Sequence, residues 1–232
     1  DEIVLVGGKD NTASGQFVTL FAGENNNVTG TASTIVAGRE GDILNSNDSS
    51  IIAGNDNNIT SSTRSSISAG TGNQIINALD SIIGAGSGNI LTGSHQSNIN
   101  AGTGNLLSGS DECSIEAGRD NEIKSALSSA ILVGRDNIVE LGTGSALIAG
   151  SGNKIDNSDA SALIGGSGNE IKNSDNSLIA VGTGNNLETS TGAAILGGGK
   201  NEIVDSNRSV IGGGLLNKLS GVNSAIIIGQ QN

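Results

Sequence analysis

The single cysteine and the single histidine are the most reactive side chains in this sequence. A cysteine nucleophile needs a nearby base such as histidine to hold it as the thiolate. Cys113 stands sixteen residues from Ser97 and from Ser129, so we interpret it as a small residue in a serine position. We interpret His95 as a solvated turn residue. The sequence therefore predicts no catalytic residues, no cofactor and no enzyme activity.

Glycine-rich segments with acidic residues have the composition of calcium or nucleotide sites. Residues 165–170 read Gly-Gly-Ser-Gly-Asn-Glu, whereas the calcium-binding nonapeptide G-G-x-G-x-D needs Asp at the end and a shorter period. Asp159 and Asp175 are turn carboxylates sixteen residues apart, which would hold a cation only weakly. No predicted helix follows the G-x-G pairs, so they are turn glycines. We predict neither a metal site nor a dinucleotide site.

The composition excludes several classes of protein. The 232 residues include 37 Gly, no Pro, Met, Trp or Tyr, and only two aromatic residues, Phe17 and Phe21. An aromatic-rich core and a collagen helix are therefore both excluded. The net charge of −12 argues against a nucleic-acid partner. No apolar run is long enough to insert into a membrane, and one cysteine cannot form an internal disulfide.

The elements that must position these residues form a repeat of fifteen or sixteen residues. Fifteen anchor glycines occur at spacings of 15, 15, then eleven of 16, then 15. The anchors are Gly8, Gly23, Gly38, Gly54, Gly70, Gly86, Gly102, Gly118, Gly134, Gly150, Gly166, Gly182, Gly198, Gly214 and Gly229. Such regular spacing is typical of a solenoid, in which each repeat contacts its neighbours.

Other positions of the repeat follow the same register. The position three before each anchor and the position five after each of the first fourteen anchors are apolar, as in Ile67 and Ile75, and predict two short strands. Between them, the second residue after the anchor is usually Gly, Asp or Asn, types that tolerate a positive φ in a turn. We predict an all-β fold, a parallel β-solenoid (β-roll) of about fifteen coils over residues 1–232. We expect one repeat array without caps and without a separate domain.

The third residue after the anchor is Asn in fourteen of fifteen repeats, the exception being Gly41. Stacked coils would place these amides above one another, where each donates to one neighbour and accepts from the next. A simple turn preference for Asn is the alternative, and it would not require so strict a column. The predicted ladder comprises Asn57, Asn73, Asn89, Asn105, Asn121, Asn137, Asn153, Asn169, Asn185, Asn201 and Asn217.

The position two before the anchor should point away from the core, yet two blocks of repeats carry apolar residues there. Exposed apolar stripes of this kind favour association with other chains. We predict an oligomer interface formed by Val36, Ile52, Leu132, Ile148, Ile164 and Leu196. We expect self-association as a homotrimer, a head-to-tail filament or both. Because no caps are apparent, we also expect an internal piece of a longer array or a stacking subunit.

The repeat resembles the heads of trimeric autotransporter adhesins (YadA-like heads) and related trimeric fibres. The resemblance lies in residues 161–171, Ser-Ala-Leu-Ile-Gly-Gly-x-x-Asn-x-Ile, and in residues 26–33 and 105–109. The family repeat has the form S-V-A-I-G-x-x-S-x-A-x-G; here the period is longer and Asn replaces a small turn residue. The resemblance implies a left-handed β-roll, a parallel homotrimer and display outside the cell.

These observations favour a structural fibre or filament segment, adhesive and exposed at the cell surface in the extracellular space. Its partners would be other copies of the chain and a host or matrix surface, with no nucleic acid and no membrane insertion. A second hypothesis is a module that binds glycan or matrix through its turns, although sugar-stacking aromatic residues are scarce. A third is an ice-binding solenoid, but Arg119 and Arg135 interrupt the turn column that contains Thr71 and Thr103.

Overall fold

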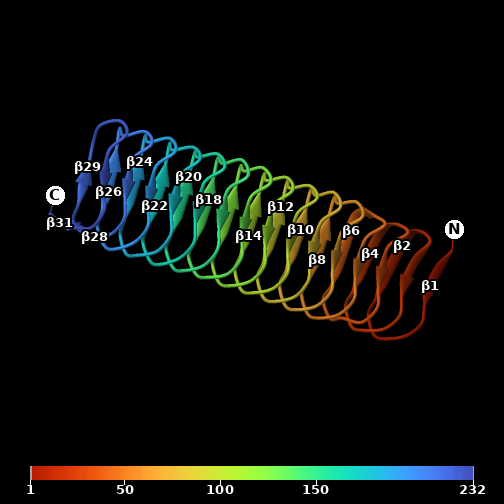
Figure 1. Cartoon of the computed structure of the whole chain (residues 1–232). Helices are drawn as coiled ribbons and strands as arrows, with labels where there is room; N and C mark the ends of the chain where they lie inside the picture. The colour runs from red at the N-terminus through yellow and green to blue at the C-terminus, as the bar shows by residue number, and fades with distance from the viewer. Residues whose placement is uncertain (1, 232) are drawn as a thin grey trace. The chain divides into compact units, whose positions relative to one another are not determined.

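A computed structural model describes residues 2–231, and every element in that part of the chain is a β-strand. The prediction of an all-β parallel β-solenoid is confirmed, with about 14 turns instead of about fifteen. The chain divides into two units, Asp1–Glu116 (unit 1) and Ala117–Asn232 (unit 2). Each unit contains coils of the one predicted type (Figure 1). The expectation about uncapped ends also concerns residues 1 and 232, which lie outside the described part.

Each coil of unit 1 gives one strand to each of two parallel sheets, a short-strand sheet and a long-strand sheet. The short-strand sheet has, in spatial order, β1 (Ile3–Leu5), β3 (Val18–Leu20), β5 (Thr34–Ile35), β7 (Ser50–Ile51), β9 (Ser66–Ile67), β11 (Ile82–Ile83), β13 (Asn98–Ile99) and β15 (Ser114–Ile115). The long-strand sheet has β2 (Thr12–Gln16), β4 (Asn27–Thr31), β6 (Asp42–Asn47), β8 (Asn58–Thr60), β10 (Gln74–Ile76), β12 (Ile90–Thr92) and β14 (Leu106–Ser108).

Unit 2 repeats this arrangement. Its short-strand sheet has β17 (Ala130–Ile131), β19 (Ala146–Leu147), β21 (Ala162–Leu163), β23 (Leu178–Ile179), β25 (Ala194–Ile195), β27 (Val210–Ile211) and β30 (Ala225–Ile226). Its long-strand sheet has β16 (Glu122–Lys124), β18 (Ile138–Glu140), β20 (Lys154–Asp156), β22 (Glu170–Lys172), β24 (Asn186–Glu188), β26 (Glu202–Val204) and β29 (Lys218–Leu219). The remaining strands, β28 (Gly214–Leu215) and β31 (Gly229–Gln230), pair with each other.

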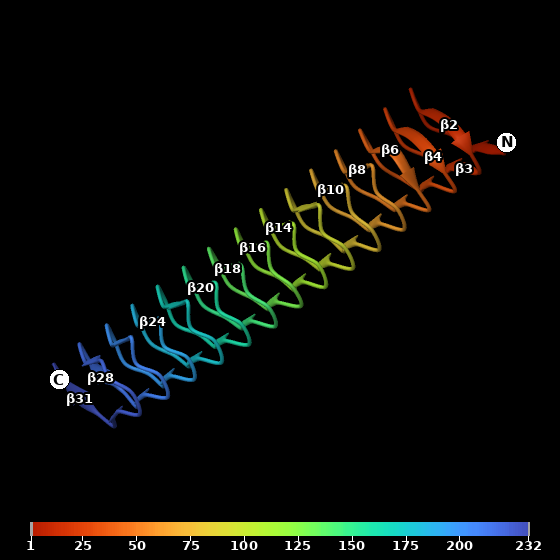
Figure 2. The ribbon, with the colours of Figure 1, turned by 90° about the horizontal axis from the view of Figure 1, so that it is seen from above.

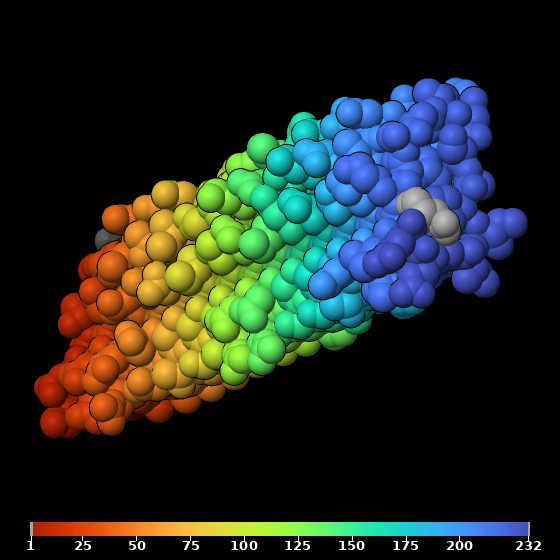
Figure 3. All heavy atoms as spheres, turned by 90° about the vertical axis from the view of Figure 1, so that its left-hand side faces the viewer, coloured from red at the N-terminus to blue at the C-terminus, as the bar shows by residue number. Residues whose placement is uncertain are grey.

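The strands pair in the register that the repeat predicts. Ile67 pairs with Ile83 in the short-strand sheet, and Ile75 pairs with Leu91 in the long-strand sheet. These four side chains are fully buried, so each inner coil contributes one aliphatic residue from each sheet to a thin core, whereas Leu5 in the first coil is exposed. In the space-filling view, residues of similar number form bands, since each coil contacts the coils before and after it (Figure 3).

Each coil has corners in which the backbone adopts a positive φ. The turn after the anchor does so at Asp56 and Gly72, as the residue types predict. Two further corners, for example at Ser61 and Arg64, flank a single bridging residue, Thr63. The coil is therefore strand, one corner, strand and two further corners, and Figure 2 shows the same outline repeated within each unit.

The change of period from fifteen to sixteen residues has a local cause. β4 and β6 pair in register up to Thr29 and Leu44, after which the register shifts so that Gly30 pairs with Ser46. Asn45 is the extra residue, and its φ of +51° lets it bulge out of the ladder. Asn45 thus introduces a corner that the coils after it also contain.

Candidate functional site: the buried ladders and the outer sheet faces

The predicted asparagines lie buried inside the first corner of each coil. Asn73 illustrates their bonding. Its Oδ1 accepts hydrogen bonds from the backbone N–H and the side-chain Nδ2 of Asn89, each at 3.1 Å. Its Nδ2 donates to the Ala69 carbonyl at 3.2 Å and to the Gly86 carbonyl at 3.0 Å. One amide therefore bonds to its own coil and to the next, as a ladder requires.

The same amide explains the anchor glycines. Gly70 has a φ of +111°, and a Cβ at this residue would overlap the Gly86 carbonyl oxygen and lie 2.5 Å from Asn73 Nδ2. A side chain at the anchor would thus be strained by the backbone and would displace the Asn amide. The Gly and Asn columns therefore depend on each other: the Asn amide occupies the space that a side chain at the anchor would need.

The one repeat without the Asn supports this coupling. Gly41 stands in the Asn position; its N–H donates to Asn26 Oδ1 at 2.9 Å, and it offers no amide to the next coil. Its anchor, Gly38, also lacks the positive φ of Gly23 and Gly54. The anchor adopts its unusual conformation where an Asn is present to bond it.

Two columns of buried hydroxyl groups support the opposite corner. Ser81, eleven residues after an anchor, donates to the Leu79 and Ser94 carbonyls at 3.1 and 3.0 Å. Ser62, eight residues after an anchor, donates to the Thr60 carbonyl and accepts from the Ala78 N–H at 3.1 Å. The sequence reasoning identified the first column and missed the second, although its run of small residues (Ser46, Ser62, Ala78, Ser94) was a usable signal.

Among the described residues, no buried side-chain nitrogen or oxygen lacks a hydrogen-bond partner. This is the condition under which polar residues in a thin core stabilise a fold, because an unpaired buried polar group costs about 1–3 kcal/mol. The buried Asn and Ser side chains of each unit therefore form hydrogen bonds between neighbouring coils.

The two reactive residues lie in different environments. Cys113 is buried in the serine column, where its N–H donates to Ser97 Oγ at 3.0 Å and its Sγ lies 3.2 Å from the Asp111 carbonyl oxygen. His95 is exposed at a corner, and its backbone N–H donates to Asp111 Oδ1 at 2.8 Å. Cys113 thus takes the place of a serine, as its position in the repeat indicates.

Asp159 and Asp175 bind backbone groups at their corner. Asp159 Oδ1 accepts from the Thr143 N–H at 2.8 Å, and Asp175 Oδ1 accepts from the Asp159 N–H at 2.9 Å. With Asn157 and Asn173 they line an open polar hollow of about 230 Å³. No group of three or more His, Cys, Asp or Glu suited to a metal occurs in residues 2–231. Each carboxylate thus joins its coil to a backbone N–H of the coil before it.

The predicted interface residues lie on the outer face of the short-strand sheet, and they are exposed. Their exposed fractions are 38% for Val36, 47% for Ile52, 39% for Leu132, 37% for Ile148, 39% for Ile164 and 46% for Leu196. Backbone bonds such as Ile148 N–H to the Leu163 carbonyl at 2.9 Å hold them in the stack. The interface itself remains a prediction.

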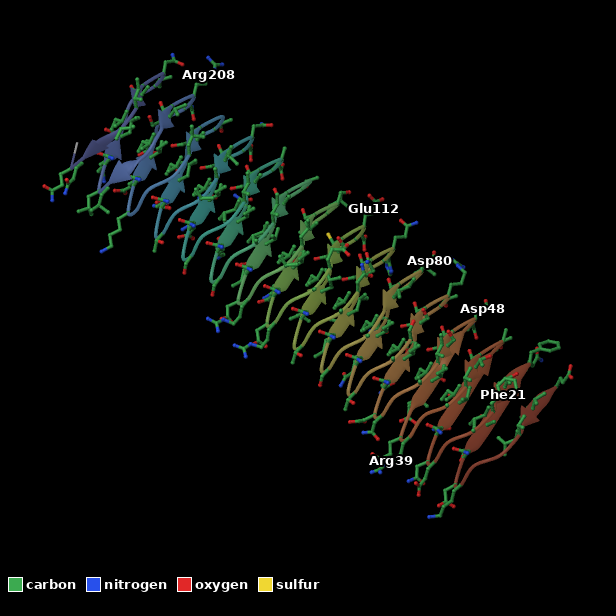
Figure 4. All side chains as sticks on the ribbon, turned by 60° about the horizontal axis from the view of Figure 1, so that its bottom comes forward. Phe21, Arg39, Asp48, Asp80, Glu112 and Arg208 are labelled. Carbon is green, nitrogen blue, oxygen red and sulfur yellow. The ribbon has the colours of Figure 1, made fainter. Side chains whose placement is uncertain are left out.

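Charged side chains lie mainly at the corners and on the long-strand sheet. Figure 4 shows Asp48, Asp80 and Glu112 along one edge of unit 1 and Arg39 along the opposite edge. The hydrogen bond from Arg64 lowers the pKa of the Asp80 carboxyl. Burial, with a smaller contribution from the charge of a neighbouring carboxylate, raises the pKa of Asp42.

Within the described residues, no helix is long and apolar enough to cross a membrane. No protein-family model and no curated protein matches the sequence. Among solved structures, the chain shows a weak similarity to a protein from Desulfovibrio desulfuricans G20 that is named as a candidate acetyltransferase. The sequence identity is 9% and the TM-score is 0.19. The match covers 86% of this chain and 65% of the other protein, so the chain spans just under two thirds of that protein's length.

A second solved structure, a candidate acetyltransferase from Bacillus cereus, shares 14% identity at a TM-score of 0.13, over 78% of this chain and 74% of that one. Both TM-scores lie far below those of shared folds, so neither name carries over to this chain. What is shown is the class: a parallel β-solenoid repeat protein.

Proposed function

We propose that this chain is a structural, adhesive segment of an extracellular fibre at the cell surface. The observation that supports the proposal is the set of buried Asn and Ser ladders, whose bonds run from each coil to the next. Because the buried polar side chains bond neighbouring coils to each other, the stack of coils resists bending and stretching. The resemblance of its repeats to adhesin heads also favours this function.

In this proposal the mechanism is passive. Parallel in-register coils place equivalent side chains at intervals of about 4.8 Å. A surface could therefore meet a regular row of identical corners and sheet positions, and many weak contacts would add through multivalency. No step of this mechanism requires a bond to be made or broken.

The proposal is tested by an attachment assay on the purified full chain. Beads coated with the chain are passed over immobilised matrix proteins, glycan arrays and bare glass, and retention under flow is counted. We expect retention well above that of beads coated with the heat-denatured chain. Equal retention of native and denatured coats on every surface would overturn the adhesive part. Electron micrographs of the natural material without fibres would overturn the structural part.

A further inference from the structure

The outer face of the short-strand sheet in unit 2 is apolar over six successive coils. Its first column, at the outward residue of each strand, reads Ala130, Ala146, Ala162, Leu178, Ala194 and Val210. Its second column, just after each strand, reads Leu132, Ile148, Ile164, Ala180, Leu196 and Gly212. None of these twelve positions has a charged or hydrogen-bonding side chain. We call this surface the apolar face.

The same columns in unit 1 show that the fold does not require an apolar surface there. Ser66, Asn98 and Ser114 occupy the first column, and Ser68 and Asn100 occupy the second. Asn98 Nδ2 donates to Asn100 Oδ1 at 2.8 Å, a bond between outward side chains. Polar residues are thus accommodated at these positions, and the apolar face of unit 2 needs another explanation.

The opposite side of unit 2 has the reverse character. The outward residues of its long-strand sheet are mostly Lys, Glu and Asp. Lys154 Nζ lies 2.9 Å from Asp156 and 3.5 Å from Glu140, and Lys218 Nζ lies 3.0 Å from Glu202. Unit 2 therefore has one solvated, ion-paired sheet face and one face without charge.

The apolar face is large enough for a specific interface. Seven large side chains on it or at its border are 37–51% exposed: Leu132, Val133, Ile148, Ile164, Val181, Leu196 and Val210. Together they expose on the order of 500 Å² of apolar surface, the upper end of what a monomer shows in one patch. Two such faces packed together would bury about the 1,000 Å² that a specific interface requires.

The spacing of the side chains on the apolar face matches that of a second copy of unit 2. Its side chains recur once per coil, at about 4.8 Å, and a second copy of unit 2 repeats at the same interval. At four of the six coils an Ala (Ala130, Ala146, Ala162 or Ala194) lies beside a Leu or Ile, which leaves a trough next to a ridge, and at the coils of Leu178 and Val210 the larger residue is in the first column instead. The ridge of one copy fits the trough of another, as in face-to-face packing of β-sheets about 10 Å apart.

We propose that the apolar face of unit 2 is the pairing surface for a second copy of the same unit, packed face to face. This inference deepens the proposed structural role and rests on it for its purpose, because lateral pairing stiffens and thickens a fibre.

The first experiment measures the mass of the full chain by sedimentation equilibrium over a range of concentrations. The double variant Ile148→Asp with Ile164→Asp places two charges on adjacent coils of the apolar face. Its matched control, Thr92→Asp with Ser108→Asp, places two on adjacent coils of the long-strand sheet in unit 1. We expect the native chain and the control to pair and the apolar-face variant to pair at least 100-fold more weakly. A monomeric native chain, or equal weakening in both variants, would overturn the proposal.

A second measurement does not depend on a disruptive substitution. Ala162→Cys places a thiol at the centre of the apolar face, and Thr143→Cys places one at an exposed corner; the native Cys113 is buried. We expect maleimide labelling of the first variant to slow as protein concentration rises and labelling of the second to stay constant. Equal labelling at all concentrations would overturn pairing. So would flotation of the native chain with phosphatidylcholine vesicles in preference to pairing, since the face would then be a lipid surface.

Failure of pairing and failure of adhesion are distinguishable. A monomeric chain that still retains beads under flow would leave the proposed function standing and would remove only the pairing surface. A chain that pairs and does not attach would do the reverse.

Discussion

Replacing Asn185 by Ala should remove the coil-to-coil bonding of one ladder residue. Asn185 Oδ1 accepts from the Asn201 N–H at 3.0 Å, and its Nδ2 donates to the Gly198 and Val181 carbonyls at 3.2 and 3.4 Å. Truncation removes one hydrogen bond from each of these three backbone groups, of which the Asn201 N–H is buried and the two carbonyls are partly buried. At about 0.5–1.5 kcal/mol for each bond, the expected cost is about 1.5–4.5 kcal/mol.

The chain offers a matched control in the next residue. Asn186 is the outward residue of β24 and is partly exposed, whereas Asn185 is buried. Asn186→Ala makes the same chemical change on the solvent side, and we expect it to alter stability by no more than about 0.5 kcal/mol.

Amide hydrogen exchange is the appropriate assay, because a solenoid can open locally without unfolding as a whole. In Asn185→Ala the amide of Asn201 should exchange with solvent roughly 10–1,000 times faster than in the native chain. This range follows from the free-energy cost given above, because each step of about 1.4 kcal/mol corresponds to a factor of ten. In Asn186→Ala its rate should stay within a few-fold of the native rate. Equal effects of the two variants, or no effect of the first, would refute the argument that the buried amides bond the coils.

Four further substitutions test the coupling of the columns and the pH dependence. Gly41→Asn should close the gap in the ladder and raise stability by about 1 kcal/mol, seen as a higher melting temperature; a lower one would contradict it. Gly70→Ala should cost more than about 2 kcal/mol, whereas Gly72→Ala, whose Cβ meets no atom nearer than 4.0 Å, should cost about 1 kcal/mol in denaturant titrations. Because burial raises the pKa of Asp42, its ionised form opposes folding at neutral pH, and this cost disappears as the pH falls through the raised value. Asp42→Asn should therefore stabilise the chain at neutral pH and less so in acid; a gain that grows in acid would contradict the direction.

The columns of the repeat made most of the fold predictable from sequence. Ile67 and Ile75 mark two inward positions at a fixed distance from Gly70, and strands with a period of two can bury both in only one way. The turn after the anchor was equally predictable, because Gly72 and Asp56 belong to the few residue types that accept a positive φ.

Other features depend on three-dimensional contacts, and the residue types indicate them only weakly or not at all. Ser62 looks like a loop residue in a segment rich in Ser and Thr, and its burial follows from a corner at Ser61 that residue type does not reveal. The requirement for glycine at Gly70 follows from the position of the Asn73 amide. The contrast between the two faces of unit 2 became meaningful only when the sheet positions were known.

The central claim is that buried side chains join each coil to the next, sixteen residues further along the chain. The most direct test is a scalar coupling across the hydrogen bond, measured by NMR between the backbone nitrogen of Asn169 and the side-chain carbonyl carbon of Asn153. The Asn169 N–H donates a hydrogen bond to Asn153 Oδ1 at an N–O distance of 3.0 Å. We expect this coupling and its equivalent for Asn73 and Asn89, with none onward from Gly41. A folded chain in which these couplings are absent, while the Asn amides exchange with water as fast as those at the corners, would contradict the account.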